Sequence, residues 1–247
     1  MPNIEQIEKY LEQLAPLNTA EAWDNVGLLV HACDSTDKVL ISLDITHDAV
    51  AEAARLGCGL IISHHPVIFT PLRTIAKDDV VFELIQNNIS AICMHTNLDA
   101  ANGGVNYILA NALGLTSVSA LPQLGCIGSL MDIISCKELA NYCEKQLSAH
   151  IKYVDTRQSI FRVALVGGSG GEFIDDAVSA GADCFITGEA SYHDAQKAKA
   201  LGISLIVAGH FATENIVCEA LCKKLQKEFT NTQFIVNAVG HDAFEYL

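Results

Sequence analysis

Short apolar runs alternate with amphipathic segments along this chain, and this alternation limits the fold more than any other feature. The runs at 39–45, 60–63 and 90–94 have the length of buried strands, and the segments between them, at about 48–56 and 78–87, have the apolar spacing of helices. A strand, a helix and a second strand in this order are typical of the βαβ unit, whose strands run parallel. The sequence therefore predicts an α/β fold with a largely parallel sheet.

Residues that start or stop helices support this interpretation. Apolar residues three and four apart over 4–14 predict an opening helix that Pro16 ends, and Gly57 stands where a helix needs a C-terminal cap. The stretch at about 115–158 is predicted to form short strands and one helix near 136–147. Because no linker-like segment interrupts the chain, its two halves are expected to pack closely.

The second half of the chain resembles the first in outline. Residues 54–65 and 179–189 both begin with small residues and a glycine, Gly57 or Gly181, continue through an apolar run and end in polar residues. Residues 89–96 resemble residues 203–210, and the two segments follow Gly57 and Gly181 respectively. A chance match of common residue types is the alternative. We expect one domain over 1–247 that contains two similar, closely packed α/β lobes at about 1–120 and 160–247.

Composition excludes several classes of partner. The chain has 15 Lys and Arg against 29 Asp and Glu, which gives a formal net charge of -14. A surface that binds DNA, RNA or an anionic membrane is built from clustered Lys and Arg. We therefore expect neither a nucleic-acid nor a membrane partner, and an anionic substrate would need a local device such as a metal ion.

The cysteines and the first residues bear on location. The nine cysteines lie in apolar runs and form no Cys-x-x-Cys pair, so they are predicted to be buried free thiols in a reducing compartment. Acidic residues occur early, where a signal peptide would be basic and then apolar. The expected location is the cytoplasm.

Histidines and carboxylates follow the predicted strands of the first half. His64 and His65 come directly after the strand at 60–63, and His95 and Asp99 follow the next strand. In open α/β sheets, chemistry collects beyond the carboxyl ends of the strands. A pair of surface loop histidines is the alternative, but the neighbouring carboxylate favours a metal site.

A matching pair occurs in the second half. His210 leaves a predicted strand, and Glu214 stands four residues later near the start of a long helix that runs toward Phe229. Helix capping by Glu214 or Thr213 is the alternative. Imidazole and carboxylate ligands together suit zinc, iron, manganese or nickel and do not distinguish among them.

Three further segments are less specific. The glycine turn within 163–173 could receive a phosphate on backbone N–H groups, although a plain tight turn is the preferred interpretation. Glu189 and His193 lie at a strand-to-helix junction, where a role near a substrate and simple helix capping are both open. Trp23 and Asp24 are predicted to form a buried structural turn.

Five motifs of the chain, taken together, resemble those of the NIF3-like family. They are TrpAspAsnValGlyLeu, SerHisHisPro, HisThrAsnLeuAspAla, ThrGlyGluAlaSerTyrHisAsp and GlyHisPheAlaThrGlu. The resemblance covers nearly the whole chain. It is closest to the compact bacterial form, because the domain that longer members insert between the lobes is absent from the short stretch at 121–158.

The resemblance implies a metal site, an assembly and an activity. Two divalent ions would lie in the cleft between the lobes, in subunits that form a ring-shaped homohexamer. Members of this family carry the label "GTP cyclohydrolase 1 type 2 homolog". The implied ligands are the residues that the strand ends suggest, with His64 and His210 predicted on one ion, His65 and Asp99 on the other, and Glu214 bridging.

Two functions remain open on the sequence. The first is a metal-dependent hydrolase acting on a small anionic, nucleotide-like substrate, in which His95, Glu189 and His193 handle protons. The second is a metal-binding or metal-delivery protein without turnover. An adaptor with purely structural metals is disfavoured, because five ligands shared by two ions leave positions open to water.

Overall fold

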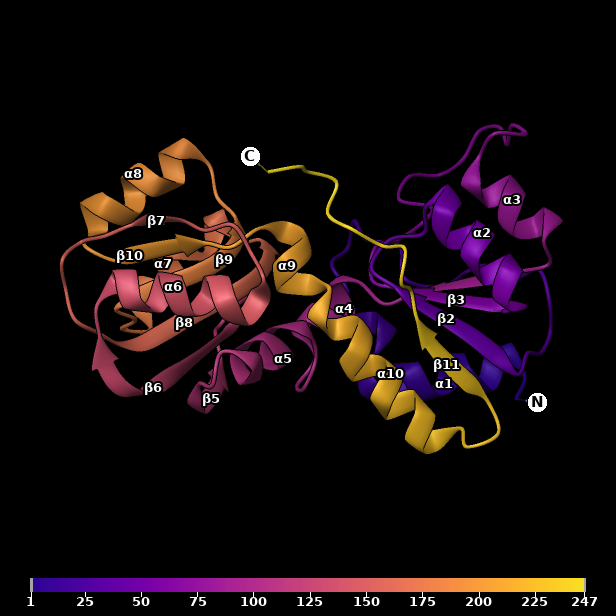
Figure 1. Ribbon diagram of the computed structural model, residues 1–247, viewed down its shortest axis with the longest axis horizontal. Coiled ribbons are helices and arrows are strands. Elements are labelled where there is room, and N and C mark those ends of the chain that lie inside the picture. The colour runs from indigo at the N-terminus through magenta and orange to yellow at the C-terminus, as the bar shows by residue number, and fades with distance from the viewer. Residues whose placement is uncertain (1, 247) are drawn as a thin grey trace. The chain divides into compact units, whose positions relative to one another are not determined.

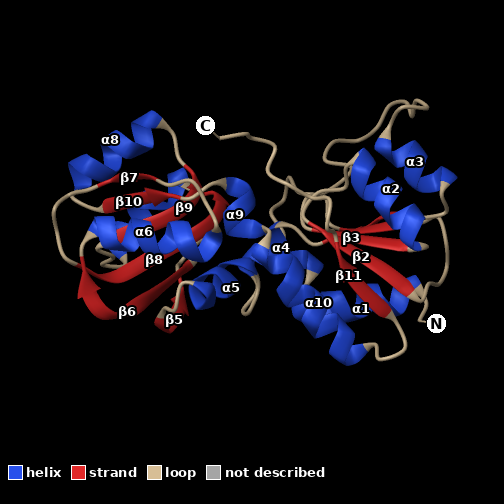
Figure 2. Cartoon of the chain, in the orientation of Figure 1, coloured by secondary structure: helices blue, strands red, loops and turns tan. Residues whose placement is uncertain are grey.

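The computed structural model describes residues 2–246, which form two compact units. Unit 1 contains residues 2–101 and 217–241, and unit 2 contains residues 102–216 and 242–246. Each unit is built around one β-sheet with helices on both faces, as the ribbon and the secondary-structure colouring show (Figures 1 and 2). The predicted α/β class is therefore confirmed.

The elements of unit 1 alternate as the sequence predicts. In chain order they are α1 (Ile4–Leu14), the 3₁₀ turn η1 (Leu17–Thr19), β1 (Gly27–Val30), β2 (Lys38–Ser42), α2 (His47–Leu56), β3 (Leu60–Ser63), α3 (Val80–Gln86), β4 (Ser90–Cys93), α4 (Thr96–Ala100), α10 (Ile216–Glu228) and β11 (Gln233–Val236). The sheet order is β1-β4-β3-β2-β11, and only β1 runs antiparallel to its neighbour. The largely parallel sheet is confirmed.

Local chemistry explains where these elements begin and end. Asn3 caps α1 through its side chain, and Gly57 ends α2 at a φ of 75°, a left-handed conformation that favours glycine. The strand predicted at 39–45 ends early, because the Ser42 hydroxyl donates to the Asp44 carbonyl at 2.6 Å and turns the chain. That turn takes Asp44 out of the ladder.

Unit 2 has a mixed sheet. Its elements are α5 (Val105–Ala112), β5 (Thr116–Ala120), β6 (Cys126–Ile134), α6 (Cys136–Leu147), β7 (Lys152–Val154), β8 (Ile160–Ser169), the 3₁₀ turn η2 (Gly171–Phe173), α7 (Ile174–Ser179), β9 (Cys184–Glu189), α8 (Tyr192–Leu201), β10 (Ser204–Val207) and α9 (His210–Glu214). The order is β5-β6-β8-β9-β10-β7, with parallel pairing from β8 through β10.

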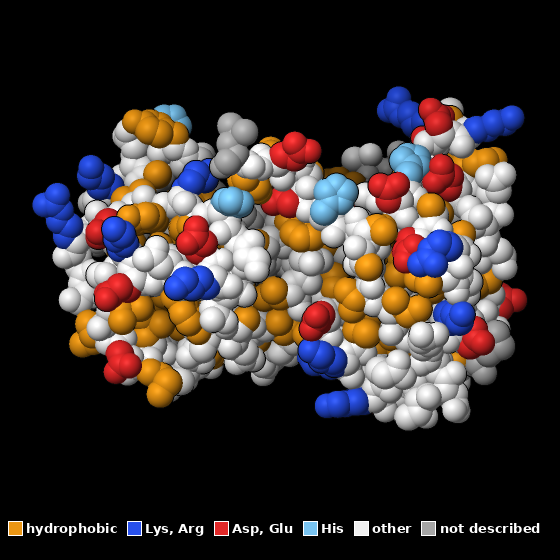
Figure 3. All heavy atoms as spheres, in the orientation of Figure 1, with side chains coloured by type: hydrophobic (Ala, Val, Ile, Leu, Met, Phe, Trp, Pro, Cys, Tyr) orange, Lys and Arg blue, Asp and Glu red, His pale blue; other side chains and the backbone are white. Residues whose placement is uncertain are grey.

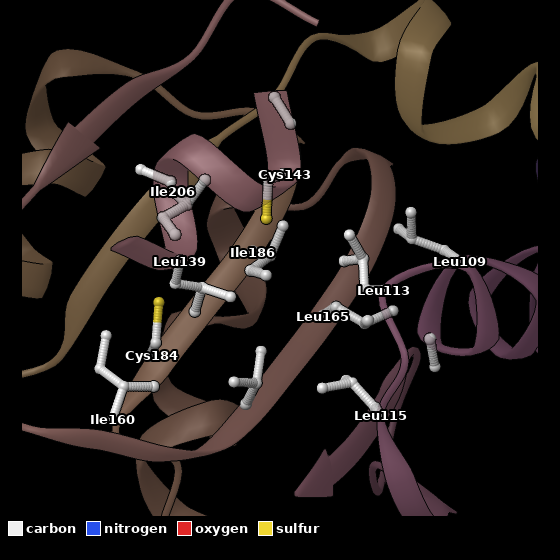
Figure 4. Packing of buried hydrophobic residues seen from close by; sticks show 14 of the residues in the cluster. Leu109, Leu113, Leu115, Leu139, Cys143, Ile160, Leu165, Cys184, Ile186 and Ile206 are labelled. Carbon is white, nitrogen blue, oxygen red and sulfur yellow. The ribbon is translucent and has the colours of Figure 1, made fainter. Parts of the chain in front are cut away.

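Two apolar layers stabilise the sheet of unit 2. On one face α5 and α6 pack on alternate residues of β8 and β9, with Leu109 and Leu139 opposite Leu165 and Ile186 (Figure 4). On the other face α7 and α8 cover Ala164, Val166 and Phe185. Because successive strand residues point to opposite faces, a strand segment buried on both sides is apolar throughout, as β8 is from Val163 to Val166.

The repeated outline corresponds to a repeated βαβαβ element. In unit 1 it is β2-α2-β3-α3-β4, and in unit 2 it is β8-α7-β9-α8-β10. Gly57 and Gly181, which align in the two sequence halves, both have a φ of 75° and lie one and two residues after a helix, respectively. The unit boundaries differ from the lobes expected at about 1–120 and 160–247, because β11 pairs with β2 and returns residues 217–241 to unit 1.

The cysteines and the helices bear on two further predictions. All nine cysteines are free, and seven of them are buried, which confirms the predicted thiols. Among residues 2–246, none of the helices has both the length and the apolar composition needed to cross a bilayer.

Candidate metal centre

The parallel strands of unit 1 bring their carboxyl ends to one edge of the sheet. Ser42 pairs with Ser63, and Ser63 with Cys93, so the residues after β2, β3 and β4 leave the sheet side by side. These residues include Asp44, the His64–His65 pair and His95. Because β1 is antiparallel, its first residue, Gly27, pairs with Cys93, and the segment before β1 reaches the same edge.

Backbone hydrogen bonds hold the two adjacent histidines. The amide of His64 donates to Ser42 O at 3.2 Å, and the amide of His65 donates to Leu43 O at 2.9 Å. The thiol of Cys93 donates to the carbonyl of His64 at 3.0 Å. The main chain at this pair is therefore fixed from both neighbouring strands, which is the condition for a preorganised site.

Each of these imidazoles has an oxygen partner at Nδ1. His64 Nδ1 lies 2.9 Å from Met94 O, and His65 Nδ1 lies 2.7 Å from Asp44 Oδ1. A carbonyl oxygen can only accept, so neutral His64 carries its proton on Nδ1 and has its lone pair on Nε2. A histidine that ligates a metal usually donates its other ring N–H to a carbonyl or a carboxylate in this way.

His95 has the same arrangement through a buried carboxylate. Its Nδ1 lies 2.9 Å from Asp24 Oδ1, and Asp24 Oδ2 accepts hydrogen bonds from the amide of Thr96 at 3.1 Å and from its hydroxyl at 2.5 Å. The Asp24 side chain is fully buried. Burial opposes ionisation, but the hydrogen bonds from Thr96 and His95 outweigh it, so the pKa of Asp24 is below its usual value.

The three rings converge. One ring nitrogen from each of His64, His65 and His95 lies within 4.8 Å of the others, a spacing that one metal ion can bridge. Asp99, in the first turn of α4, adds a carboxylate oxygen 3.6 Å from His64 Nε2. Burial is the main reason that the pKa of His95 is below its usual value, which favours the neutral imidazole that a metal requires.

Unit 2 carries a second group of possible ligands. His210 is the first residue of α9, separated by two residues from the end of β10, and its Nε2 lies 2.9 Å from Glu214 Oε2 one helical turn later. Its Nδ1 lies 3.5 Å from Glu189 Oε2 at the end of β9. Glu214 is buried at the last residue of α9, and the long helix begins only at Ile216, so the single predicted helix is in fact two.

The glycine turn of β8 makes room for this pair. A Cβ at Gly168 would overlap Glu214 Oε1 and lie 3.2 Å from His210 Nε2, and the φ of Gly168 is +60°. A Cβ at Gly171 would overlap the Asp194 carboxylate. The glycines therefore allow α9 and α8 to approach the strand closely, which supports the plain-turn interpretation over a phosphate cradle.

Two other predicted residues, His193 and Trp23, have exposed side chains. His193 is exposed on α8, with its ring 5.9 Å from that of Tyr192, so its catalytic role stays a prediction. Trp23 is 59% exposed rather than buried, and its ring lies 5.7 Å from Phe69 and 6.1 Å from His95. The expectation of a buried turn is correct for Asp24 and wrong for Trp23.

Sequence reasoning missed the two carboxylates that orient the histidines. Asp44 and Asp24 lie 21 and 71 positions from the histidines that they contact. The position of Asp44 could have marked it as a site residue, because Asp44 follows a predicted parallel strand just as His64 and His95 do. Asp24 gave no comparable signal, since it precedes β1, which runs antiparallel to its neighbour, instead of following a parallel strand.

The donor atoms fit divalent metal ions. Neutral imidazoles with fixed tautomers and carboxylate oxygens at the same sheet edge are the ligands that zinc, iron, manganese and nickel accept. Unit 1 offers His64, His65, His95 and Asp99, and unit 2 offers His210 and Glu214. The side chains of these residues are therefore already oriented to bind a metal ion.

Comparison with known proteins identifies the family of the chain. A Clostridium perfringens protein named GTP cyclohydrolase 1 type 2 homolog is 32% identical over 99% of both chains, and a Campylobacter jejuni protein of that name is 35% identical over 98% of this chain and 99% of its own. The crystal structure of the Staphylococcus aureus hypothetical protein SA1388 superimposes with a TM-score of 0.94, at 29% identity over 99% of both chains. The sequence model of Duf34/NIF3 (NGG1p interacting factor 3) matches residues 2–243, and the chain therefore belongs to the DUF34/NIF3 family.

Proposed function

We propose that this protein is a metal-dependent hydrolase that uses two divalent ions to act on a nucleotide-like substrate. The observation that carries the proposal is that the converging imidazoles of His64 and His65 are already hydrogen-bonded at Nδ1, which leaves the lone pair of each Nε2 for a metal ion. The proposed ligands are His64, His65, Asp99, His210 and Glu214.

The distances within each unit revise the expected sharing of ligands. Asp99 Oδ1 lies 3.6 Å from His64 Nε2, so these two residues, rather than His65 and Asp99, are suited to one ion. Glu214 Oε2 lies 2.9 Å from His210 Nε2 and supplies a buried carboxylate to the other group. A carboxylate with two oxygens can serve two ions, and Glu214 keeps its proposed bridging role.

Bound divalent ions would supply Lewis-acid chemistry, which lowers the pKa of water and polarises the scissile group. The protein would handle the protons. His95, held by Asp24, can accept a proton from attacking water at Nε2 and pass it to the leaving nitrogen. Glu189 is 49% exposed beside His210 and can orient a substrate N–H group.

The nucleotide-like substrate is taken from the names of the relatives. In a cyclohydrolase reaction on a purine ring, water adds to the imidazole carbon between the two nitrogens, one carbon–nitrogen bond breaks, and the released nitrogen takes a proton. The product is a formamide, and one water is consumed. His95 is the proposed group for both proton transfers.

A metal-delivery function is the alternative, and one observation favours it. The side chains of His65 and His210 are 24% and 35% exposed, so solvent and a partner can reach these ligands. Partly exposed imidazole ligands exchange metal more readily than enclosed ones. In that case the ions would be cargo, and the protein would show no turnover.

Turnover separates the two functions. Metal-loaded wild type, Glu214→Gln and chelated protein, at equal concentration, would be assayed with GTP and a panel of nucleotides for ring-opened products. We expect turnover in the loaded wild type alone, because the Glu214→Gln substitution keeps the shape of the side chain but removes its charge. Metal release to a chelator without turnover on any nucleotide would support delivery and contradict hydrolysis.

The oligomeric state is part of the same proposal. The family resemblance implies a homohexamer, and we propose that assembly for this chain. Light scattering coupled to size-exclusion chromatography measures the mass directly. A mass near six times that of one chain is expected, and a stable monomer would contradict it.

A further inference from the structure

A second feature of unit 2 lies beside His210 and is not explained by metal binding. It is an open cavity of about 890 Å³, lined by residues of β7, β8, β9 and η2 and by Phe244 and Tyr246. Its size falls within the range of roughly 300–1,000 Å³ that is typical of small-molecule sites. His210 and Glu189 lie on its wall, so a molecule in the cavity would contact the proposed metal ligands.

The C-terminal segment is held in place as one wall of this cavity. Both carboxylate oxygens of Asp242 are used: Oδ1 accepts from the amide of Phe244 at 3.0 Å and Oδ2 accepts from the hydroxyl of Tyr246 at 3.1 Å. The ring of Tyr246 stacks on that of His150, with centroids 4.1 Å apart and planes inclined by 21°. The two hydrogen bonds therefore shape the segment, and the ring stack on His150 holds it against the rest of unit 2.

The same wall presents aromatic surface to the cavity. Phe244 is 69% exposed and Tyr246 is 47% exposed, although both line the cavity. An aromatic face exposed in a concave site is a platform on which a flat ring can stack. Burying such a face removes apolar surface from water, which favours binding.

The polar lining determines which ring fits. Glu172, Glu189 and Asp194 line the cavity together with one lysine, Lys152. Asp194 Oδ2 already accepts from the amide and the hydroxyl of Ser191, so Glu172 and Glu189 are the carboxylates more open to a ligand. Carboxylates accept hydrogen bonds, and a ligand ring should therefore carry N–H donors on its edge.

We propose that this cavity binds a planar heteroaromatic ring with exocyclic amino groups, stacked on Phe244 and Tyr246 and hydrogen-bonded to Glu172 and Glu189. The ring would lie next to His210. The link to catalysis rests on the proposed hydrolase function, whereas ring binding itself needs only the residues of unit 2. The amino-bearing edge distinguishes the expected ligand from a plain aromatic ring.

The test measures ring binding without metal. Full-length protein treated with a chelator would be titrated into 2-aminopurine riboside, whose fluorescence is quenched when the base stacks. Saturable quenching is expected. Purine riboside, which lacks the amino group, should compete about tenfold less well, because it offers no donor to the carboxylates.

Matched variants identify the binding surface. Phe244→Ala and Tyr246→Ala should each weaken binding about tenfold or more, the range seen when a stacking aromatic is removed. Phe161→Ala, an aromatic truncation on β8 outside the cavity lining, should leave binding unchanged. Glu172→Gln should weaken the binding of 2-aminopurine riboside but not that of purine riboside. Tyr246→Phe keeps the aromatic ring and should therefore retain stacking.

The outcomes separate this inference from the proposed function. Absence of saturable quenching, or an equal loss in Phe161→Ala, would overturn the cavity assignment even if the loaded protein hydrolyses a nucleotide. Binding that depends on Phe244 and Glu172 in a protein without turnover would support the cavity and contradict the hydrolase. Equal binding of the two ribosides would overturn the amino-edge requirement.

Discussion

At the scale of single residues, the candidate centre depends on which ring nitrogen of each histidine is available. The histidines could be predicted, because each follows an apolar run that is recognisable as a buried strand. Their orientation could not, because Met94 O, Asp44 and Asp24 contact them only after the sheet forms. Hydrogen-bond partners far apart in sequence leave no local pattern.

The buried contact between Asp24 and His95 leads to the first prediction. Asp24→Asn should retain metal content, since Asp24 is not a proposed ligand, but lower kcat about 10- to 100-fold because His95 loses its carboxylate partner. The loss of a buried charged acceptor should also cost about 1–3 kcal/mol of stability. Metal analysis, kcat and urea unfolding would be measured together. Asp34→Asn, at a carboxylate with 98% side-chain exposure, is the control, and equal kcat in both variants would contradict the role of Asp24.

Buried thiols give a prediction for pH. Burial raises the pKa of Cys58 to about 11 and of Cys126 to about 12. In the unfolded chain these thiols ionise near their ordinary pKa, so above that pH the unfolded state binds fewer protons and stability falls as pH rises. Each thiol should lower the unfolding free energy by up to about 1.4 kcal/mol per pH unit until its folded pKa is reached. Urea midpoints at pH 8, 9 and 10 would show the decline, and a slope unaltered by Cys58→Ala would argue against it.

At the scale of elements, the sequence predicted most of the repeated βαβαβ architecture. α1 at Ile4–Leu14, α6 at Cys136–Leu147 and β3 at Leu60–Ser63 match the predicted ranges, because caps, periodic apolar residues and strand-length runs are local signals. The early end of β2 and the division between α9 and α10 were missed. The first depends on a hydrogen bond from the Ser42 hydroxyl to the Asp44 carbonyl. Nothing in the structure explains the second.

Two glycines with positive φ provide a matched pair of substitutions. Gly57→Ala should cost about 1 kcal/mol, since its φ is +75° but no atom lies within 4 Å of the added Cβ. Gly168→Ala should cost more and lower metal content, because its Cβ would overlap Glu214 Oε1. Thermal unfolding and metal analysis of the two variants would be compared. Similar losses in both would show that Glu214 can move aside without consequence.

At the scale of the whole molecule, charge was predictable and the course of the chain between units was not. The net charge of -14 follows from counting residues. The discontinuous units arise because β11 pairs with β2, which lies near the other end of the sequence, and no signal in either strand specifies that partner. The C-terminal segment that lines the cavity of unit 2 was missed for the same reason.

The charge predicts weak association with nucleic acids. Lys and Arg side chains are scattered among Asp and Glu on the visible face instead of forming a continuous basic patch (Figure 3). Because phosphate binding requires clustered cations, we expect no measurable binding of duplex DNA or RNA in fluorescence anisotropy at physiological salt. Tight binding that weakens steeply with added salt would contradict this expectation.

The identity and number of metal ligands are the central claim, and anomalous X-ray scattering from crystals grown with zinc or manganese tests them most directly. Data collected on either side of the metal absorption edge locate each ion independently of the protein atoms. We expect two ions per subunit, ligated by His64, His65, Asp99, His210 and Glu214, with Asp99 and His64 on the same ion. A single ion, or ions contacted by fewer than three of these five side chains, would contradict it.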